Sequence, residues 1–205
     1  MADLPTLPTL PTLRSLTGLP GQPAPLRESV LVMIDCQNTY RRGVMQLEGV
    51  EEALAEARRL LDRARALGVP ILHVAHDAGP GTPYDVRAEI GQIADIVAPL
   101  GDEPLIVKQY PSSFEKTDLG ARLSRLGAKN LVLAGFMTHM CVNSTARAAF
   151  NLGYQGTVVA GATASRALPS PTGGVVPAQV VHEAALATLA DLFAVVVGRE
   201  RDIAD

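Results

Sequence analysis

Short apolar runs alternate with amphipathic segments along most of this 205-residue chain. The runs that predict β-strands lie at residues 29–35, 70–76, 105–109, 130–134, 156–160 and 192–197. Because these runs are apolar at successive positions, both faces of each strand are expected to be buried, as in a parallel sheet. The predicted fold class is therefore α/β: a three-layer, doubly wound, mostly parallel six-stranded sheet in the order 3-2-1-4-5-6, with helices on both faces.

Helical periodicity fills the segments between the predicted strands. Apolar residues from 49 to 67 recur on one stripe, and Gly68 follows as a helix stop. Further helices are predicted at residues 86–97, 119–126, 140–152 and 178–191. In such a fold, ligands bind beyond the carboxyl ends of the strands, at the switch point between the first and fourth strands.

The first 24 residues differ from the rest of the chain. Pro-Thr-Leu occurs three times, at 5–7, 8–10 and 11–13, and recurring proline favours extended or polyproline II backbone over helix. We therefore predict an extended arm at 1–24 and a single domain at 25–205. Two interpretations of the arm stay open: a disordered tail, or an arm whose leucines pack on a partner subunit.

Composition narrows the range of functions. The 18 basic and 21 acidic residues are interspersed and give a formal net charge of -3, so neither nucleic acid nor membrane is an expected partner. No apolar run reaches the roughly 20 residues that span a bilayer, and the N-terminus does not resemble a signal peptide. Cys36 and Cys141 are expected to be free thiols in a cytoplasmic protein that binds a small-molecule substrate.

Three chemically active residues stand near the carboxyl ends of predicted strands. Asp35 ends the first strand, Lys108 lies near the end of the third, and Cys141 follows the fourth within the turn at 135–142. A thiol at the start of a helix has backbone N–H groups aimed at it, which favour a thiolate and an oxyanion beside it. With Asp35 as base and Lys108 holding that carboxylate charged, this pattern predicts a cysteine hydrolase.

Each of these residues also has a structural interpretation. A lone cysteine is commonly a small buried hydrophobe, and a strand-end aspartate or lysine is commonly a loop cap or a solvated side chain. A charge that directly continues a buried strand is costly unless it is paired, so Asp35 and Lys108 support each other. By strand alternation, Cys36 points to the opposite side from Asp35 and is assigned to packing.

No metal or other cofactor is expected. His73 and His76 are three residues apart on a predicted strand, so their side chains face opposite sides, which is poor geometry for a shared ion. The first strand is not followed by Gly-x-Gly-x-x-Gly, which argues against a dinucleotide cofactor. His139 lies in the turn before Cys141 and is expected to touch substrate, whereas His182 is assigned a structural role.

Three motifs, in this order along the chain, resemble those of one known family. They are Val-Met-Ile-Asp-Cys-Gln-Asn at 32–38, Lys-Gln-Tyr-Pro-Ser-Ser-Phe at 108–114 and Gly-Phe-Met-Thr-His-Met-Cys-Val at 135–142. From about Ser29 to its C-terminus the chain resembles the isochorismatase-like cysteine hydrolases, which include isochorismatases, nicotinamidases and N-carbamoylsarcosine amidases. The resemblance implies the same doubly wound fold and a homodimer or homotetramer.

The resemblance also implies residue roles. Asp35, Lys108 and Cys141 would form a catalytic triad, and the backbone N–H groups of Thr138 and Cys141 would form the oxyanion hole. The peptide bond between Met137 and Thr138 would be cis.

Departures from the family pattern narrow the chemistry. Isochorismate-cleaving members often lack the cysteine, so Cys141 favours amide over vinyl-ether hydrolysis. Nicotinamidases carry an Asp-x-His metal motif that residues 41–47 lack, and Gly161 stands where many members have aspartate.

The sequence therefore predicts a metal-independent, cysteine-dependent hydrolase of a small amide, ureido or lactam-like substrate, acting through a thioester. Gln37, Tyr40 and His139 are predicted to contact the substrate, on their positions alone. Two alternatives stay open: an isochorismatase-type vinyl-ether hydrolase, and a non-catalytic thiol redox sensor or scaffold.

Overall fold

The computed structural model describes residues 10–205, and its centre is a six-stranded sheet. The strands are β1 (Ser29–Ile34), β2 (Ile71–His76), β3 (Leu105–Lys108), β4 (Asn130–Phe136), β5 (Gln155–Ala164) and β8 (Ala194–Val197). Neighbouring strands pair in parallel in the order β3-β2-β1-β4-β5-β8. The predicted α/β class and doubly wound order are confirmed, with β8 as the sixth strand.

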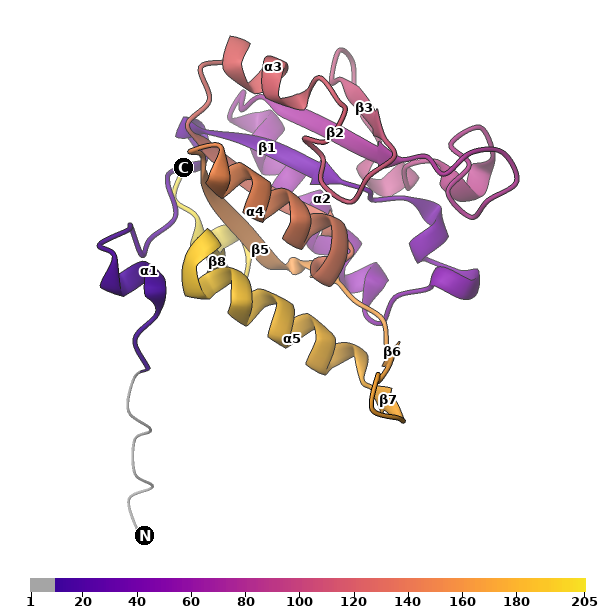
Figure 1. Cartoon of the computed structure of the whole chain (residues 1–205). Coiled ribbons are helices and arrows are strands. Elements are labelled where there is room, and N and C mark those ends of the chain that lie inside the picture. The colour runs from indigo at the N-terminus through magenta and orange to yellow at the C-terminus, as the bar shows by residue number, and fades with distance from the viewer. Residues whose placement is uncertain (1–9) are drawn as a thin grey trace, which may run out of the picture.

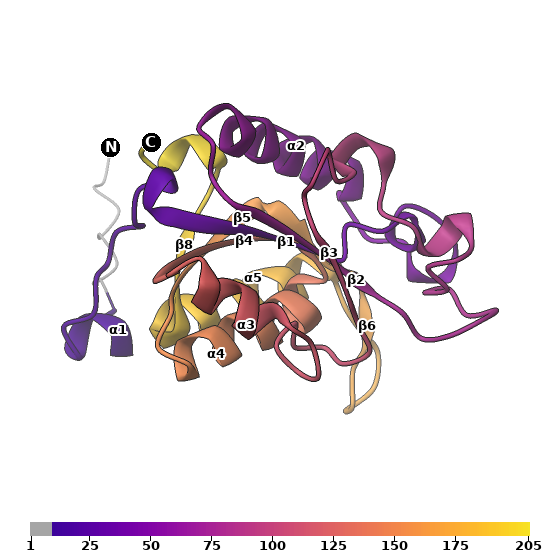
Figure 2. The same cartoon turned by 90° about the horizontal axis from the view of Figure 1, so that it is seen from above.

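Helices cover the sheet on both faces (Figures 1 and 2). Helix α2 (Val50–Ala66) lies on one face, and α3 (Leu119–Arg125), α4 (Asn143–Asn151) and α5 (Ala178–Thr188) lie on the other. Each face has its own apolar cluster, one packed against α2 and one packed against α3 and α4. This is the three-layer arrangement that strands apolar on both faces require.

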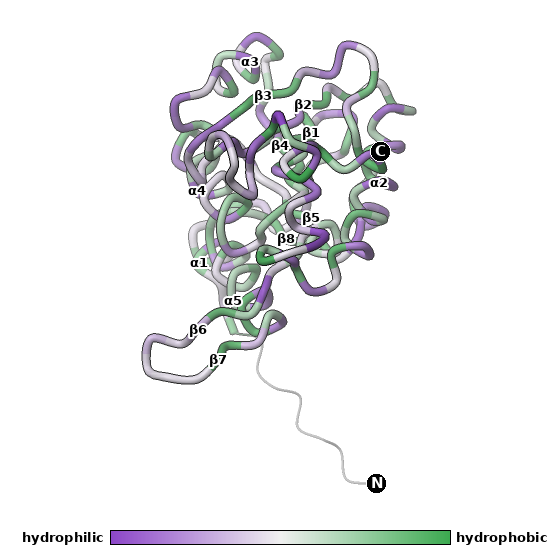
Figure 3. Tube along the Cα trace, turned by 90° about the vertical axis from the view of Figure 1, so that its right-hand side faces the viewer, coloured by the Kyte–Doolittle hydropathy of each residue, from purple (hydrophilic) through white to green (hydrophobic). Residues whose placement is uncertain are grey.

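The burial of β1 shows why the sheet needs both layers. All six of its residues are buried, and the neighbours Leu31 and Val32, which point to opposite faces, are both fully covered. Burying one such side chain stabilises the fold by about 1.5–3 kcal/mol. Exposing either face of the sheet would therefore lose the stabilisation from several buried side chains. Figure 3 shows hydrophobic residues gathered along the strands and hydrophilic ones on the outer turns.

Residues 86–97 do not form the predicted helix. They contain two short 3-10 turns, Glu89–Gly91 and Asp95–Val97, and the chain between them bonds to the segment after β1. Asn38 N–H donates to Gln92 O, and Ala94 N–H donates to Cys36 O. These backbone groups are therefore satisfied by another segment, which competes with helical bonding.

Two element ends also differ from expectation. β4 runs two residues beyond 134, to Phe136, and a π-helical turn at Thr138–Val142 precedes α4, where a continuous helix from 140 was predicted. α5 likewise passes into a π-helical turn at Leu189–Phe193 before β8 begins. The Pro- and Gly-rich loop near 169–174 is flanked by a small antiparallel ribbon, β6 (Leu168–Pro169) with β7 (Val175–Val176).

The N-terminal segment is partly helical. Helix α1 (Leu13–Leu16) begins after Thr12, whose side chain accepts from Ser15 N–H, so the prediction of extended backbone throughout 1–24 is wrong here. Arg14 is buried and donates to Pro20 O and Leu192 O, which ties this segment to the body of the same chain. The Pro-Thr-Leu repeat at 5–7 and most of the next lie outside the described residues. Among residues 10–205, no helix combines the length and apolar character needed to cross a bilayer.

Candidate active site

The three predicted catalytic residues meet at the carboxyl edge of the sheet. Asp35 follows β1, Lys108 is the last residue of β3, and Cys141 lies in the π-helical turn after β4. Lys108 Nζ lies 2.7 Å from Asp35 Oδ2 and 3.3 Å from Cys141 Sγ. Lys108 reaches across β2 to make both contacts, and all three side chains are buried.

His76 supplies a third contact to Lys108. Its Nδ1 lies 3.2 Å from Lys108 Nζ, so the three N–H donors of the ammonium have three partners: a carboxylate, a sulfur and an imidazole. Sequence reasoning considered His76 only as a metal ligand. The signal that identifies it is strand register, because His76 and Lys108 are paired as the last residues of β2 and β3.

The backbone at this edge is unusual. Asp35 has a φ of 49°, in the left-handed region that a non-glycine residue occupies at a cost of about 1–3 kcal/mol, and such residues cluster at functional sites. Gly135, on the neighbouring β4, has a φ of 119°, and a Cβ there would lie 1.9 Å from Ile34 O. Only glycine therefore allows β1 and β4 to approach closely just before Asp35 and the cysteine turn.

Burial shifts the pKa values of the Asp35 carboxyl and the Cys141 thiol. It raises the pKa of the Asp35 carboxyl, against the opposing pull of Lys108. Burial and the charge of Asp35 raise the pKa of the Cys141 thiol to about 12, although Lys108 lowers it. The thiolate expected from a helix start is therefore not the resting form. α4 begins at Asn143, two residues later, while Cys141 is enclosed in the preceding turn.

The turn that carries Cys141 is anchored on two sides. Thr138 Oγ1 lies 2.9 Å from His182 Nδ1 on α5, so His182 has the structural contact assigned to it. His139 Nδ1 lies 3.1 Å from Ser165 Oγ, just beyond β5. The cis peptide bond joins Phe136 to Met137, directly after β4 and one bond earlier than the resemblance implied.

Gln37 and Tyr40 lie near the site but are fully enclosed. Gln37 Nε2 donates to His76 O (2.9 Å) and Gly91 O (2.6 Å), and its Oε1 accepts from His76 N–H (2.9 Å). These bonds use the whole amide, so Gln37 holds His76 in place. The Tyr40 ring packs edge-on against Phe136 and against Tyr84, a neighbour of the site that sequence reasoning missed.

The structure accounts for glycine at position 161. A Cβ there would lie 2.8 Å from Gly198 O and 3.5 Å from Glu56 Cγ, so an aspartate does not fit without movement. Glu56 is itself a buried carboxylate. Burial alone would raise its pKa, but hydrogen bonds from Glu200 N–H and from two arginines lower it to about 2.

The described residues contain no group of three His, Cys, Asp or Glu side chains placed to hold a metal ion. His73 and His76 point to opposite faces of β2, as strand alternation predicts. His73 pairs with Glu103, whereas His76 faces Lys108.

A doubly wound parallel sheet that brings an acid, an amine and a thiol into contact at its carboxyl edge is the framework of a small-molecule hydrolase. Comparison with known sequences agrees, because the isochorismatase domain model matches residues 29–201. The chain belongs to the isochorismatase family of hydrolases, which confirms the resemblance in its three motifs.

Individual relatives span most of the chain. The secreted isochorismatase effector Isc1 of Verticillium dahliae is 35% identical over 175 residues, which cover 85% of this chain and 90% of the relative. The ureidoacrylate amidohydrolase RutB of Stutzerimonas stutzeri is 30% identical over 172 residues, 66% of this chain and 69% of the relative. A crystal structure of an isochorismatase from Pseudomonas putida KT2440 has a TM-score of 0.90 and 38% identity, and covers 96% of this chain and 100% of that one.

Proposed function

We propose that this protein is a cysteine-dependent hydrolase of a small amide, ureido or lactam-like substrate, and that it acts through a thioester. The observation that carries the proposal is the position of Lys108 Nζ, in contact with both Asp35 Oδ2 at 2.7 Å and Cys141 Sγ at 3.3 Å. Similarity to an amidohydrolase, RutB, supports amide chemistry.

The first half of the reaction forms the acyl-enzyme. Because its pKa is raised to about 12, the Cys141 thiol keeps its proton until a base removes it. Asp35, whose pKa is also raised by burial, takes that proton as Sγ bonds to the substrate carbonyl carbon. Asp35 then gives the proton to the leaving nitrogen, the C–N bond breaks, and the amine departs from the thioester.

Hydrolysis of the thioester restores the enzyme. Asp35 takes a proton from water as the water oxygen attacks the carbonyl carbon. The C–S bond then breaks, the acid leaves, and the proton on Asp35 returns to sulfur. In both halves Lys108 compensates the negative charge that passes between carboxylate and sulfur.

The turn offers donors for the oxyanion. Met137 O accepts from the amides of Met140 (3.0 Å) and Val142 (3.2 Å), and the amides of Thr138 and Cys141 take no part in these two bonds. We assign the oxyanion hole to the N–H groups of Thr138 and Cys141. Removing one such donor typically costs about 10²–10³ in kcat, so the geometry of this turn matters to the rate.

A matched pair of cysteine variants tests the proposal. Cys141→Ala is expected to lower turnover of amides, ureido acids, biuret and lactams by at least about 10⁴-fold for whichever compound is hydrolysed, measured as ammonia release or, for lactams, as formation of the ring-opened amino acid. Cys36→Ala removes an equally buried thiol from the other face of the sheet and is the control for lost packing. An acyl adduct on Cys141 is expected in intact-protein mass spectra. Substantial turnover by Cys141→Ala would refute the covalent route.

Vinyl-ether hydrolysis is the second candidate, and similarity to the isochorismatase effector Isc1 favours it. The same Cys141→Ala protein separates the two, because ether cleavage does not need the thiol. A redox-sensor role fits the site less well, since Cys141 is 5% exposed and burial raises its pKa, whereas sensor thiols are accessible and acidic.

A further inference from the structure

The N-terminal segment turns its leucines away from its own chain. Leucine occupies every third position from 4 to 16, and the three within the described residues are exposed: Leu10 by 83%, Leu13 by 50% and Leu16 by 69%. Arg14, between them, is buried, and its guanidinium donates to Pro20 O (2.6 Å) and Leu192 O (3.0 Å). Arg14 therefore fastens this segment to the body, while the three leucines form an outward leucine edge.

The segment meets the body at the end of α5. Leu13 N–H donates to Asp191 Oδ1 (2.9 Å), and both Asp191 and Leu192 belong to the π-helical turn that continues α5. Figure 1 shows α1 beside this end of α5. The segment that carries the leucine edge therefore adjoins α5.

The outer side of α5 is poor in charge for a surface helix. Only one of its six exposed residues is charged, in the set Gln179, Val180, Glu183, Ala184, Ala187 and Thr188. On the opposite face of the sheet, five of the six exposed residues of α2 are charged: Glu51, Glu52, Arg58, Arg59 and Asp62. A helix that is apolar all round is typical of a buried helix, and the cores of protein interfaces are depleted of charge. Because Val180 is 50% exposed in the single chain, the outer side of α5 has the composition of a covered surface without the cover.

The length and period of the Pro-Thr-Leu segment fit this surface. Polyproline II has three residues per turn, so leucine at every third position lines one edge of it. As polyproline II, the nine residues before Leu10 would span about 28 Å, and the 11 residues of α5 span about 16 Å. Residues 1–13 carry one charged side chain, Asp3, so an apolar face suits them.

We propose that the Pro-Thr-Leu segment and the outer side of α5 form a self-association surface, on which the segment of one copy lies along α5 of a second copy. The occupant is a second copy because Arg14 holds the leucine edge facing away from its own chain. Each chain carries one leucine edge and one outer side of α5. A two-fold axis therefore covers both surfaces in both chains at once. The surface is separate from the reaction proposed at Cys141.

Sedimentation equilibrium of the full chain tests the self-association. The wild type is expected to be a dimer or a larger assembly at micromolar concentration. Leu10→Glu should raise the dissociation constant at least about a hundredfold, because a dimer loses two buried leucines. Ala184→Glu should weaken association in the same direction from the α5 side. Leu126→Glu changes an exposed leucine after α3 and is the matched control, expected to alter the dissociation constant less than about threefold.

Disulfide cross-linking identifies what the segment contacts. Leu10→Cys protein is mixed with isotopically labelled Ala184→Cys protein, left to exchange subunits and oxidised mildly, with the two native buried thiols in place. Mass spectrometry should show the mixed, disulfide-linked dimer. Its yield should exceed by at least about tenfold that obtained when Ala66→Cys, at an exposed alanine of α2, replaces Ala184→Cys.

Three results would overturn the proposal. A wild type that is still monomeric at about 100 µM would mean that this surface meets a different partner. An unchanged dissociation constant in either Leu10→Glu or Ala184→Glu would mean that the copies associate through another surface. In a chain that carries both Leu10→Cys and Ala184→Cys, a disulfide within one monomer in place of a linked dimer would mean that the segment covers its own α5.

Discussion

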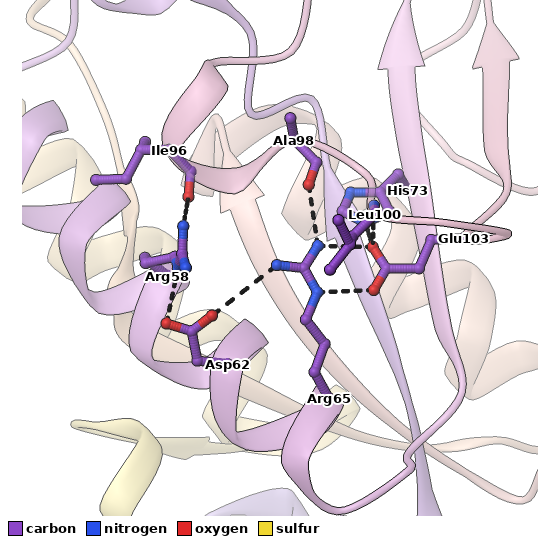
Figure 4. A network of polar contacts seen from close by, with 8 residues as sticks. All are labelled: Arg58, Asp62, Arg65, His73, Ile96, Ala98, Leu100 and Glu103. Atoms are coloured by element: carbon purple, nitrogen blue, oxygen red, sulfur yellow. Dashed lines mark hydrogen bonds and ion pairs between the residues drawn. The ribbon is translucent and has the colours of Figure 1, made fainter.

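Two carboxylates beside the same sheet, Glu103 and Asp35, have pKa values shifted in opposite directions. Glu103 accepts from Arg65 Nε (2.7 Å), Arg65 Nη2 (2.7 Å) and Leu100 N–H (2.9 Å), and it contacts His73 Nε2 at 2.9 Å (Figure 4). Burial alone would raise its pKa, but these donors lower it to about 2. Asp35 has one cation, Lys108, and the weakly acidic Cys141 thiol as its partners, and burial raises its pKa. The number of donors decides which carboxylate is a stable anion and which can serve as a base.

The residues around Glu103 join segments of the fold, whereas those around Asp35 belong to the proposed active site. Arg65 also donates to Ala98 O, so the Glu103 cluster fastens the segment before β3 to α2 (Figure 4). β2 supplies a histidine to each region, His73 to the Glu103 cluster and His76 to Lys108. We therefore expect changes at Glu103 to affect stability and changes at Asp35 to affect turnover.

The largest effect is expected from Asp35→Asn. The amide cannot take the thiol proton, and general-base catalysis is typically worth 10²–10⁴, so kcat should fall by about a thousandfold. The buried Lys108 also loses its counter-ion, so the fold is checked by thermal unfolding. Kinetics on the best substrate of the panel measure the change. A folded Asp35→Asn protein with more than about a tenth of wild-type kcat would contradict Asp35 as the base.

Glu103→Gln should produce the opposite outcome. It weakens charged hydrogen bonds, and we expect a loss of about 1–3 kcal/mol in unfolding free energy with kcat changed less than about threefold. Because the folded pKa of about 2 lies below the ordinary 4.5, the native carboxylate contributes stability above pH about 4.5 that disappears as pH falls toward 2. Urea unfolding at pH 7 and pH 3 should therefore show a smaller difference for the variant than for the wild type.

Glu115→Gln is the control for that comparison, since Glu115 is exposed and its side chain forms no ion pair with another described residue. Equal losses in the two glutamate variants at pH 7 would mean that the Glu103 cluster adds little to the fold.

Patterns along the chain located the six strands, and with them Asp35, Lys108 and Cys141, because apolar runs locate buried strands well, although β4 and β5 run beyond their predicted ends. They did not predict the contact of His76 with Lys108, which depends on register between two strands far apart in sequence. The raised pKa of Cys141 was missed for a related reason. A helix start favours a thiolate only where solvent or charge supports it, and burial is a property of the whole fold.

Residues 86–97 show the same limit. Their helical pattern was outweighed by backbone hydrogen bonds to the segment after β1, so the deciding groups come from a distant part of the chain.

The smallest effect is expected from His76→Phe. This variant also tests most sharply whether His76 serves the site around Lys108 while His73 serves the Glu103 cluster. The ring keeps the edge contact with Tyr84, which lies 5.1 Å away between centroids, but Lys108 loses one of its three acceptors. Loss of one hydrogen bond worth about 1.4 kcal/mol should lower kcat about tenfold. Burial and then Lys108 lower the pKa of His76, so it accepts near neutral pH and stops accepting only in acid.

The pH profile separates positioning from mere packing. Wild-type kcat/KM should fall in acid because both Asp35 and His76 take up protons. In His76→Phe the fall of kcat/KM in acid should come from protonation of Asp35 alone. The matched variant His73→Phe removes the contact with Glu103 on the other face of β2, so it should lower unfolding free energy and leave the profile unchanged. If His76→Phe instead lowered stability as His73→Phe does, with kcat and the pH profile intact, both histidines would be packing residues. The hypothesis that His76 acts in turnover and His73 in stability would then be wrong.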